Sequence, residues 1–219
     1  MGETATGRTG TSRTGTGEPG LRERKKQRMY QDVSDIAVRL FLERGFDAVS
    51  VAEVAAEAGI SKPTLFRYFP AKEDLVLHRI ADHETEAARI VTAAPAGPLA
   101  ALRRHFLDGL DRADPVTGLN GHPQVLAFHT LLYGTPALVA RAYGHLERSE
   151  AALAEALGGD LDARLAAGQI IAVQRILAQD NWRRSAAGEA VEAVRPDAVR
   201  AAERAFDRLE AGLPRLGHS

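Results

Sequence analysis

The chain has 219 residues, and its 28 Lys and Arg nearly balance its 29 Asp and Glu, giving a formal net charge of −1 at pH 7. It contains no cysteine, which excludes disulfide bonds, cysteine-ligated metals and thiol catalysis. No apolar run approaches the roughly 18–20 residues that a membrane-spanning helix needs, and the first residues lack the apolar core of a secretory signal. We therefore expect a cytoplasmic protein with no membrane partner.

The composition indicates helices. Alanine, leucine, glutamate and arginine favour helices and are abundant, whereas only 5% of the residues are aromatic. We predict an all-α fold. The exception is the segment 1–20, whose six Gly, six Thr and few apolar residues predict a disordered tail. Its Gly15–Gly20 stretch matches G-x-G-x-x-G, but no strand precedes it, so the context of a dinucleotide site is missing.

Glycines and a serine bound the first two predicted helices. Apolar residues recur at helical spacing from Leu21 and stop at Gly45, which has the position of a C-cap glycine. Ser50 and Glu53 form a capping box at the start of a second helix, and Gly59 ends that helix.

A third short helix and a connecting helix follow. Ser61 is the N-cap of the third helix, and Pro63 stands in its first turn, where the missing N–H costs nothing. We expect its buried side to consist of Leu65, Phe66 and Phe69. Pro70 ends this helix, and one long connecting helix is predicted over 71–91.

The stretch 93–98, rich in Ala, Pro and Gly, is the clearest interior break. We place a domain boundary there, between residues 21–92 and residues 93–219. Beyond the break, apolar spacing predicts further helices over roughly 98–112, 122–132, 135–157, 160–183 and 196–211.

Two short helices joined by residues 58–61 have the layout of a helix-turn-helix. The second would enter the major groove of double-stranded DNA, where Lys and Arg can donate to guanine and a Thr methyl or Pro ring can pack on a thymine methyl. The positions near its N-terminus are the candidate base contacts: Lys62, Pro63, Thr64 and Arg67.

A basic run at residues 22–28 adjoins this unit and carries five positive charges and one negative charge. A few cations placed along the phosphate backbone suffice for DNA binding, whatever the net charge of the chain. We predict phosphate contacts from Arg24, Lys25 and Lys26. The alternative is an ordinary solvated charge run.

These residues also carry a resemblance to a known family. The run from Val38 to Leu75, which ends ISKPTLFRYFPAKEDL, resembles the TetR family of bacterial transcription regulators, and the similarity extends over residues 22–91. The family pattern is matched at Leu40–Phe41, Gly45–Phe46, Ser50–Val51, Ile60–Lys62, Thr64–Phe66, Phe69, Lys72, Glu73 and Leu75.

The resemblance implies roles for individual residues. The recognition helix would begin at Ser61 and end at Phe69. Three residues would face base edges and three others would contact phosphate: Lys62, Pro63 and Thr64, and Ser50, Tyr68 and Lys72 respectively. Many relatives add a base contact from the second helix, but the matching residue here is Ala52, which cannot hydrogen-bond. The readout therefore rests on Lys62 and Thr64.

The resemblance implies a C-terminal helical domain that forms a homodimer with a ligand cavity in each subunit, and hence an inverted-repeat operator. Two apolar stripes are candidates for a four-helix interface. They are Leu165, Gly168, Ala172 and Ile176 in one helix, and Val199, Ala202, Phe206 and Leu209 in the last. The alternative is that both stripes face the core of their own chain.

Isolated polar and aromatic residues within apolar segments are the only signs of a ligand site. A pocket needs mostly apolar walls with a few placed polar groups. The candidates are His105, Phe106, Phe128, His129, Tyr133, Tyr143 and Gln174. They predict a hydrophobic or aromatic small molecule, and the alternative is that each polar group is a hydrogen-bonded core residue.

The sequence does not indicate an enzyme, a cofactor or a metal site. His83–Ala87 begins like the zinc motif H-E-x-x-H, but Ala87 replaces the second imidazole. There is no phosphate-binding loop and no G-x-S-x-G elbow. We therefore predict a dimeric, ligand-responsive transcriptional repressor. The alternatives are a DNA-binding regulator without a small-molecule effector, and an activator.

Overall fold

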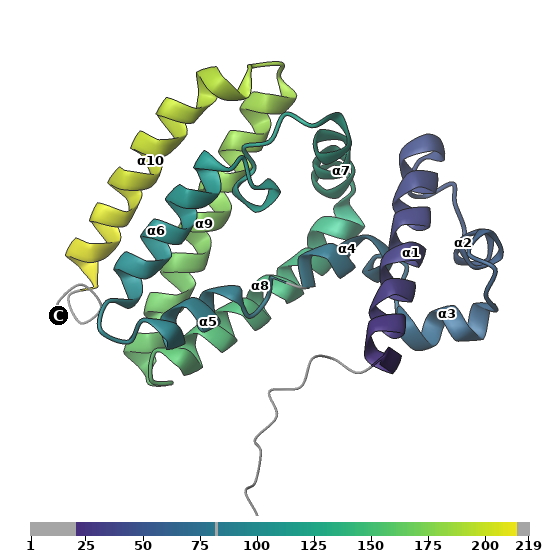
Figure 1. Cartoon of the computed structure of the whole chain (residues 1–219), viewed down its shortest axis with the longest axis horizontal. Coiled ribbons are helices and arrows are strands. Elements are labelled where there is room, and N and C mark those ends of the chain that lie inside the picture. The colour runs from purple at the N-terminus through teal and green to yellow at the C-terminus, as the bar shows by residue number, and fades with distance from the viewer. Residues whose placement is uncertain (1–20, 82, 214–219) are drawn as a thin grey trace, which may run out of the picture.

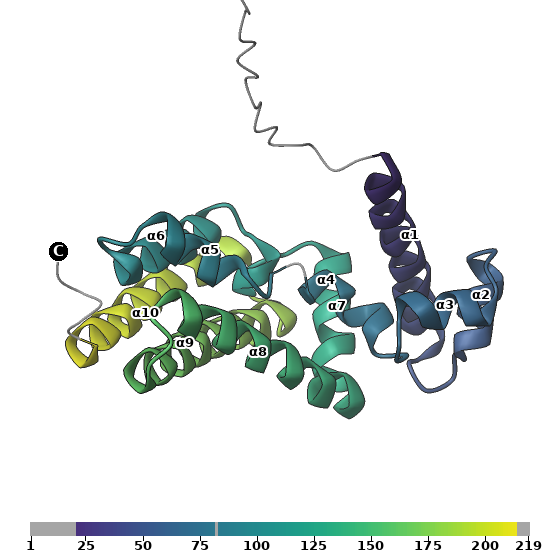
Figure 2. The same ribbon diagram turned by 90° about the horizontal axis from the view of Figure 1, so that it is seen from below.

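The chain folds into two helical lobes joined by a narrower middle (Figures 1 and 2). The structure, a computed structural model, describes residues 21–81 and 83–213, so the predicted disordered tail 1–20 lies outside the described residues. The described residues form helices and no strand, as the composition predicted. Within them, no helix is both long and apolar enough to cross a membrane.

The elements are α1 (Leu21–Arg44), α2 (Val51–Glu57), α3 (Lys62–Tyr68), α4 (Asp74–Ala81), α5 (Glu86–Ala93), α6 (Pro98–Asp111), the 3₁₀ turn η1 (Pro115–Thr117), α7 (Pro123–Gly134), α8 (Pro136–Ala156), α9 (Leu161–Ala186) and α10 (Val191–Gly212). The first lobe contains α1, α2 and α3, and the second contains α5, α6, α9 and α10 with most of α8 (Figure 1). Helices α4 and α7 lie between the lobes.

Local hydrogen bonds define the two short helices of the first lobe, as predicted. The Ser50 side chain accepts from Glu53 N at 3.2 Å, and the Glu53 carboxylate accepts from Ser50 N at 2.8 Å, which completes the capping box. The Ser50 N–H and the Arg44 guanidinium lower the pKa of Glu53 to about 2. Gly59, which ends α2, has φ +66°, a left-handed conformation that glycine adopts without strain.

The core of the first lobe extends into the middle of the molecule. Phe41, Leu65 and Leu75, from α1, α3 and α4, are buried together. Phe128 and Leu132 of α7 belong to the same cluster. The first lobe therefore packs on the second through α4 and α7, and does not hang from a free linker.

The single connecting helix predicted over 71–91 is wrong, because α4 and α5 are separate helices. Between them, His83 N donates to Ile80 O and Glu84 N to Ala81 O, the spacing of tight turns. Asp, His and Thr are poor helix formers, and the Glu84 carboxylate is hydrogen-bonded to α8. Val91 of α5 is buried in the core of the second lobe. The chain therefore passes from the first core to the second between α4 and α5, before the boundary predicted at 93–98.

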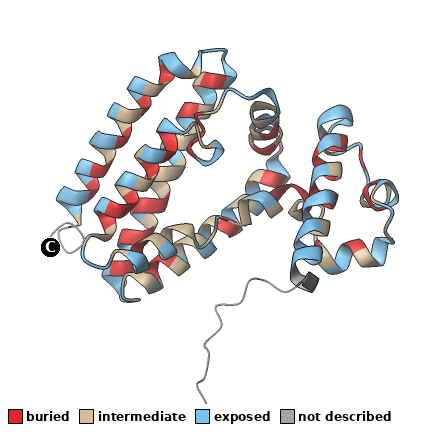
Figure 3. Cartoon of the chain, in the orientation of Figure 1, coloured by how far each residue is buried: buried red, intermediate tan, exposed pale blue. Residues whose placement is uncertain are grey.

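The second lobe surrounds a separate core, whose buried residues follow the inward sides of its helices (Figure 3). Leu102, Leu110 and Ile170 are fully buried there. The last helix begins at Val191, five residues before the predicted start, and holds Pro196 inside it. Val194, two residues before the proline, is fully buried in this core, so the first turn of the helix is packed against the second lobe.

The stripe on α10 faces the core of its own chain, which corrects half of the predicted dimer interface. Ala202, Phe206 and Leu209 are buried, and Val199 packs against the same cluster. The Phe206 ring lies 6.2 Å from the ring of Phe106 on α6, measured between centroids. The apolar spacing correctly indicated a buried face of α10, but helices α6 and α9 of the same chain cover that face.

We predict that Phe206→Ala lowers the free energy of unfolding by about 3–5 kcal/mol, because it leaves a cavity in the second core. Chemical denaturation of the purified protein measures this change. Glu203→Ala, at an exposed position on α10, is the control and should stay within about 0.5 kcal/mol. A Phe206→Ala protein as stable as the control would contradict the burial of this ring in the core.

Candidate nucleic-acid interface and internal cavity

Helix α3 has one buried face and one exposed face. Leu65 is fully buried and Phe69, the C-cap, is nearly so, and both pack in the first core. The exposed face consists of Lys62, Pro63, Phe66 and Arg67. Phe66 is 40% exposed, so its predicted burial is wrong. A helix of seven residues has room for only one buried stripe, and Leu65 occupies it.

The residues that begin α3 are hydrogen-bonded to one another. Ser61 Oγ accepts from Thr64 N at 3.2 Å and lies 2.7 Å from Thr64 Oγ1, so both hydroxyls take part in the N-cap. Lys62 and Pro63 are exposed beside this cap, whereas Thr64 is half-buried. The Thr64 hydroxyl, predicted to face base edges, is therefore held in the cap. The Lys62 side chain takes no part in the cap.

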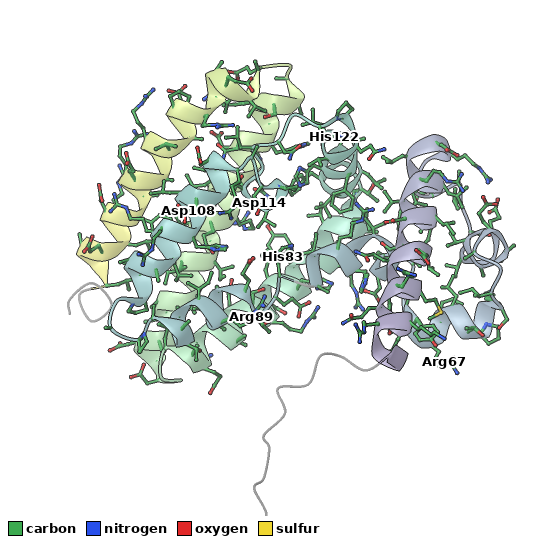
Figure 4. The ribbon with its side chains drawn as sticks, in the orientation of Figure 1. Arg67, His83, Arg89, Asp108, Asp114 and His122 are labelled. Atoms are coloured by element: carbon green, nitrogen blue, oxygen red, sulfur yellow. The ribbon has the colours of Figure 1, made fainter. Side chains whose placement is uncertain are left out.

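The C-terminal end of α3 lies beside the start of α1. Arg67, on the outer side of α3 in Figure 4, donates to Tyr68 Oη at 3.1 Å. The Tyr68 ring contacts the ring of Tyr30 on α1, with 5.1 Å between centroids. One to two turns before Tyr30, the basic residues Arg24, Lys25 and Lys26 are exposed. The fold thus brings the basic run next to the predicted recognition helix.

Lys72, predicted to bind phosphate, contacts the loop after α1. Its ammonium group donates to Phe46 O and lies 4.3 Å from the centroid of the Phe46 ring. Ser50, the other predicted phosphate contact in this region, uses its hydroxyl in the α2 cap and is exposed. Both residues therefore have partners within the chain before any nucleic acid binds.

A cavity of about 540 Å³ lies in the second lobe, next to the middle helices. Its lining comes from α4 through α9, and it includes His83 and Asp114, which Figure 4 labels. The structure brings all seven predicted ligand residues to this one cavity: His105, Phe106, Phe128, His129, Tyr133, Tyr143 and Gln174. Apolar atoms make most of its surface, although about half of the lining residues are polar or charged, so it suits a largely apolar molecule with some polar groups.

Gly118 lets η1 close against α9 at the edge of the cavity. A Cβ atom at this position would lie 1.9 Å from Ala178 O, and the residue has φ +72°. Asn181, buried on α9, donates to Thr117 O at 2.9 Å. These contacts fix η1 as part of the cavity wall.

The polar groups that line the cavity differ in pKa, in hydrogen-bonding partners and in exposure. Burial lowers the pKa of His129 to about 4, so its imidazole is neutral at pH 7, and its Nδ1 atom is buried with no hydrogen-bond partner. Burial also raises the pKa of Tyr133, whose ring lies 4.6 Å from the ring of Trp182. His105 contacts the Glu86 carboxylate at 3.4 Å, and Tyr143 is half exposed.

Two arginine–carboxylate pairs join α4 and the turn after it to α8. Asp74 accepts from Arg141 Nε at 2.9 Å and from Nη2 at 3.0 Å. Glu84 accepts from Arg148 Nε and Nη2, both at 2.9 Å, and the hydrogen bonds from Arg148 and His145 lower its pKa. Arg141 and Arg148 are seven residues apart, two helical turns, and so share one face of α8.

Among the described residues, Glu84 lines the cavity, together with His145, which is bonded to it. Asp74 and Arg141 do not line it, so only the Glu84–Arg148 pair borders the cavity. Helix α4 is also joined to α1. Ser34 Oγ donates to Leu75 O at 2.7 Å in a buried hydrogen bond. Helix α4 therefore has hydrogen-bonded partners in both the first lobe and the second.

The apolar stripe on α9 is exposed in the single chain, unlike that on α10. Leu165 and Ile176 are each 55% exposed, and Leu161, on the same helix, is 66% exposed. Gly168 and Ala172 lie between them and are half-buried. Exposed leucine and isoleucine at helical spacing are typical of a surface that binds another protein.

Sequence reasoning missed both arginine–carboxylate pairs and the exposure of Phe66. The pairs join residues more than sixty positions apart, and a charged residue on a helix carries no local sign of its partner. The seven-residue spacing of Arg141 and Arg148 was the one available signal. No group of three or more His, Asp or Glu in the described ranges could hold a metal ion.

Comparison with known proteins identifies the class. A helix-turn-helix lobe that presents a basic, exposed second helix defines a DNA-binding protein. The family model for bacterial regulatory proteins, tetR family, matches residues 34–78, from α1 into α4. The HTH-type transcriptional regulator TcmR of Streptomyces glaucescens is 31% identical over 163 residues, which cover 71% of this chain and 72% of that protein. The chain belongs to the TetR family of DNA-binding transcriptional regulators, as its motif predicted.

Other relatives and solved structures agree with this fold. The nucleoid occlusion factor SlmA of Pasteurella multocida is 28% identical over 67% of this chain and 78% of its own. A TetR-family regulator of Streptomyces coelicolor superposes with a TM-score of 0.52 at 23% identity, over 88% of this chain and 99% of that one. NalD, the secondary repressor of the MexAB-OprM multidrug efflux pump in Pseudomonas aeruginosa, gives 0.53 at 16% identity, over 83% and 97%.

We predict that His129 makes the protein less stable as the pH falls from 6.5 towards 4. In this window the unfolded chain binds a proton at this imidazole and the folded chain does not, so the loss reaches about 2–3 kcal/mol. Denaturation at pH 7 and at pH 4.5 measures it. His129→Leu should lose less stability between these two pH values than the unmodified protein. His122→Asn, which removes an exposed imidazole and keeps a capping side chain, should behave as the unmodified protein does. Equal pH dependence in all three proteins would contradict this prediction.

Proposed function

We propose that the chain is a dimeric repressor, released from an inverted-repeat operator by a small apolar or aromatic molecule that binds in the cavity. One observation carries the proposal. The cavity is lined by Ile80 and Glu84, at the end of α4 and in the turn after it, and α4 also packs on the DNA-binding lobe. A molecule in the cavity therefore touches the segment that joins it to the recognition helix.

The DNA contacts that we propose follow from exposure. Lys62, Pro63 and Arg67 form the free face of α3 and would meet base edges. The basic residues at the start of α1, with Ser50, Ser61, Thr64, Tyr68 and Lys72 around α3, would meet phosphate or fix the orientation of the lobe. Lys72 would exchange its contact with Phe46 O for a phosphate oxygen.

The dimer would form through the exposed stripe of α9. Leu165 and Ile176 would be covered by the same stripe of a second copy, and the small residues Gly168 and Ala172 would allow the two helices to approach closely. The buried side chains of α10 take no part in this contact. Two DNA-binding lobes related by a two-fold axis would then require an inverted repeat.

Release would be a shift between two positions of α4. The Glu84 carboxylate, held by Arg148 and His145, fixes the turn after α4 at the cavity edge. Phe128 and Leu132 both line the cavity and belong to the core of the first lobe. A ligand that binds one position of these groups better than the other changes the population of DNA-competent dimers.

The open cavity favours this reading over a regulator without an effector, because packed side chains would have filled an unused site. The choice between repressor and activator depends on where the operator lies relative to a promoter. We take repression as our proposal, and we propose no catalytic role.

Selection of binding sites from random duplex DNA tests the proposed function. We expect an enriched inverted repeat, and affinity for it that falls steeply with salt. Lys62→Ala should lose the preference for one base pair in each half-site, at a cost of about 1–3 kcal/mol. Lys72→Ala is the comparison and should weaken all sequences alike and reduce the salt dependence. No enriched sequence would contradict DNA regulation, and an enriched single half-site would contradict the dimer.

Loss of the Arg148 side chain tests the role of the α4–α8 contact. We expect Arg148→Gln to free the end of α4, so that the two DNA-binding lobes of a dimer vary more in their separation and operator affinity falls several-fold. The chain has no cysteine, so a spin label at Ala48→Cys measures that separation directly. Glu147→Gln, exposed on the same turn, should change neither property. An Arg148→Gln protein with an unchanged distance distribution would show that this contact does not hold α4.

A further inference from the structure

The wall of the cavity contains an arginine whose charge no carboxylate of the described residues neutralises. Arg175 on α9 is half-buried and lines the cavity, as do Ile171 and Gln174 on the same face of the helix. Its Nη1 atom donates to Gln179 Oε1 at 3.2 Å, and its guanidinium carbon lies 5.9 Å from the centroid of the Tyr143 ring. An amide and an aromatic ring are thus its partners within the described chain, and neither balances its charge.

The other strongly charged side chains of the wall differ from Arg175, because each already has a charged or hydrogen-bonded partner. Arg79, the other arginine among the described lining residues, is paired with Asp35. The three carboxylates of the wall are held as follows: Glu84 by Arg148 at 2.9 Å, Glu86 by His83 at 2.9 Å, and Asp114 by Val116 N at 3.1 Å in the cap of η1. A charge withdrawn from water is stabilised by an opposite charge, and Arg175 is the arginine of this wall whose position for one is open.

Polar side chains gather around Arg175, and apolar surface adjoins them. Burial raises the pKa of Tyr133, while the charge of Arg175 and a hydrogen bond with Gln179 oppose that rise, so the three side chains lie near one another. One turn before Arg175, Ile171 is buried in the second core and lines the cavity. Phe128, on α7, adds an aromatic ring to the wall. The cavity therefore combines one cationic, hydrogen-bonding group of side chains with extensive apolar surface.

We propose that the molecule bound in the cavity is an apolar or aromatic carboxylic acid, ionised, whose carboxylate is held by Arg175. This inference rests on the proposed small-molecule response and names the chemical class of the effector. The planar guanidinium matches both oxygens of a carboxylate, and its bond to Gln179 leaves further N–H groups available. Hydrogen bonds between ionised partners are shorter and stronger than neutral ones. The apolar body of the acid would pack on Ile171 and Phe128.

Displacement of a neutral fluorescent probe from the full-length protein tests the charge of the preferred ligand. The probe is N-phenylnaphthylamine, an uncharged aromatic amine whose fluorescence rises in apolar surroundings. Three competitors share a naphthalene ring and differ in charge: naphthylacetate, naphthylacetamide and naphthylethylammonium. We expect naphthylacetate to displace the probe at a concentration about tenfold lower than the amide, the effect of one charge-assisted contact. The ammonium compound should be the weakest.

Three variants separate the arginine contact from the shape of the cavity. Arg175→Gln should bring naphthylacetate to the level of the amide, and it should bind the probe as the unmodified protein does. Arg175→Lys should keep part of the preference, because an ammonium group supplies the charge without the planar fork. Arg208→Gln removes an exposed arginine of α10 that does not line the cavity, and this control should keep the full preference.

Four results would overturn the inference. In the unmodified protein these are equal displacement by the acid and the amide, and strongest displacement by the ammonium compound. In Arg175→Gln they are an unchanged preference for the acid, and loss of probe binding, which would make Arg175 a support of the cavity wall. A protein that binds neither the probe nor any competitor would instead contradict the proposed small-molecule response.

Discussion

The position of α4 determines how the two lobes are related. This helix has only eight residues, too few to be stable alone in water. Its buried Leu75 packs in the first core, while Asp74 and Glu84 reach Arg141 and Arg148 on α8. A single exposed ion pair contributes about 0–1 kcal/mol, but each of these is a two-point contact, and together they fix both ends of the segment. The orientation of the DNA-binding lobe thus depends on bonds weak enough to be exchanged.

The first core and the cavity are not independent, because α7 takes part in both. Phe128 and Leu132 pack against the first lobe and also line the cavity. A change in the volume that a bound molecule occupies would be felt directly by that core, since close-packed interiors transmit small displacements. The polar contacts of α4 and the apolar contacts of α7 thus both link the DNA-binding lobe to the wall of the cavity.

Sequence reasoning succeeded where the cause of a structure is local. Ser50 and Glu53 lie three residues apart, so their capping box could be read directly, and isolated polar residues in apolar helices marked the cavity wall. It failed where the cause is distant. The break between α4 and α5 depends on Glu84 meeting α8, and the burial of Phe206 depends on which helix covers it. Phe66 was misplaced because seven residues are too few for apolar spacing to define a face.

The division of α3 into two faces has a consequence for how such a regulator changes over time. The core positions Leu65 and Phe69 maintain the fold, whereas Lys62, Phe66 and Arg67 contribute little to it. Substitutions on the outer face can therefore accumulate without loss of stability, and a duplicated gene can acquire a new DNA sequence preference while its cavity stays unchanged. The DNA sequence that the protein recognises and the shape of its cavity can diverge separately.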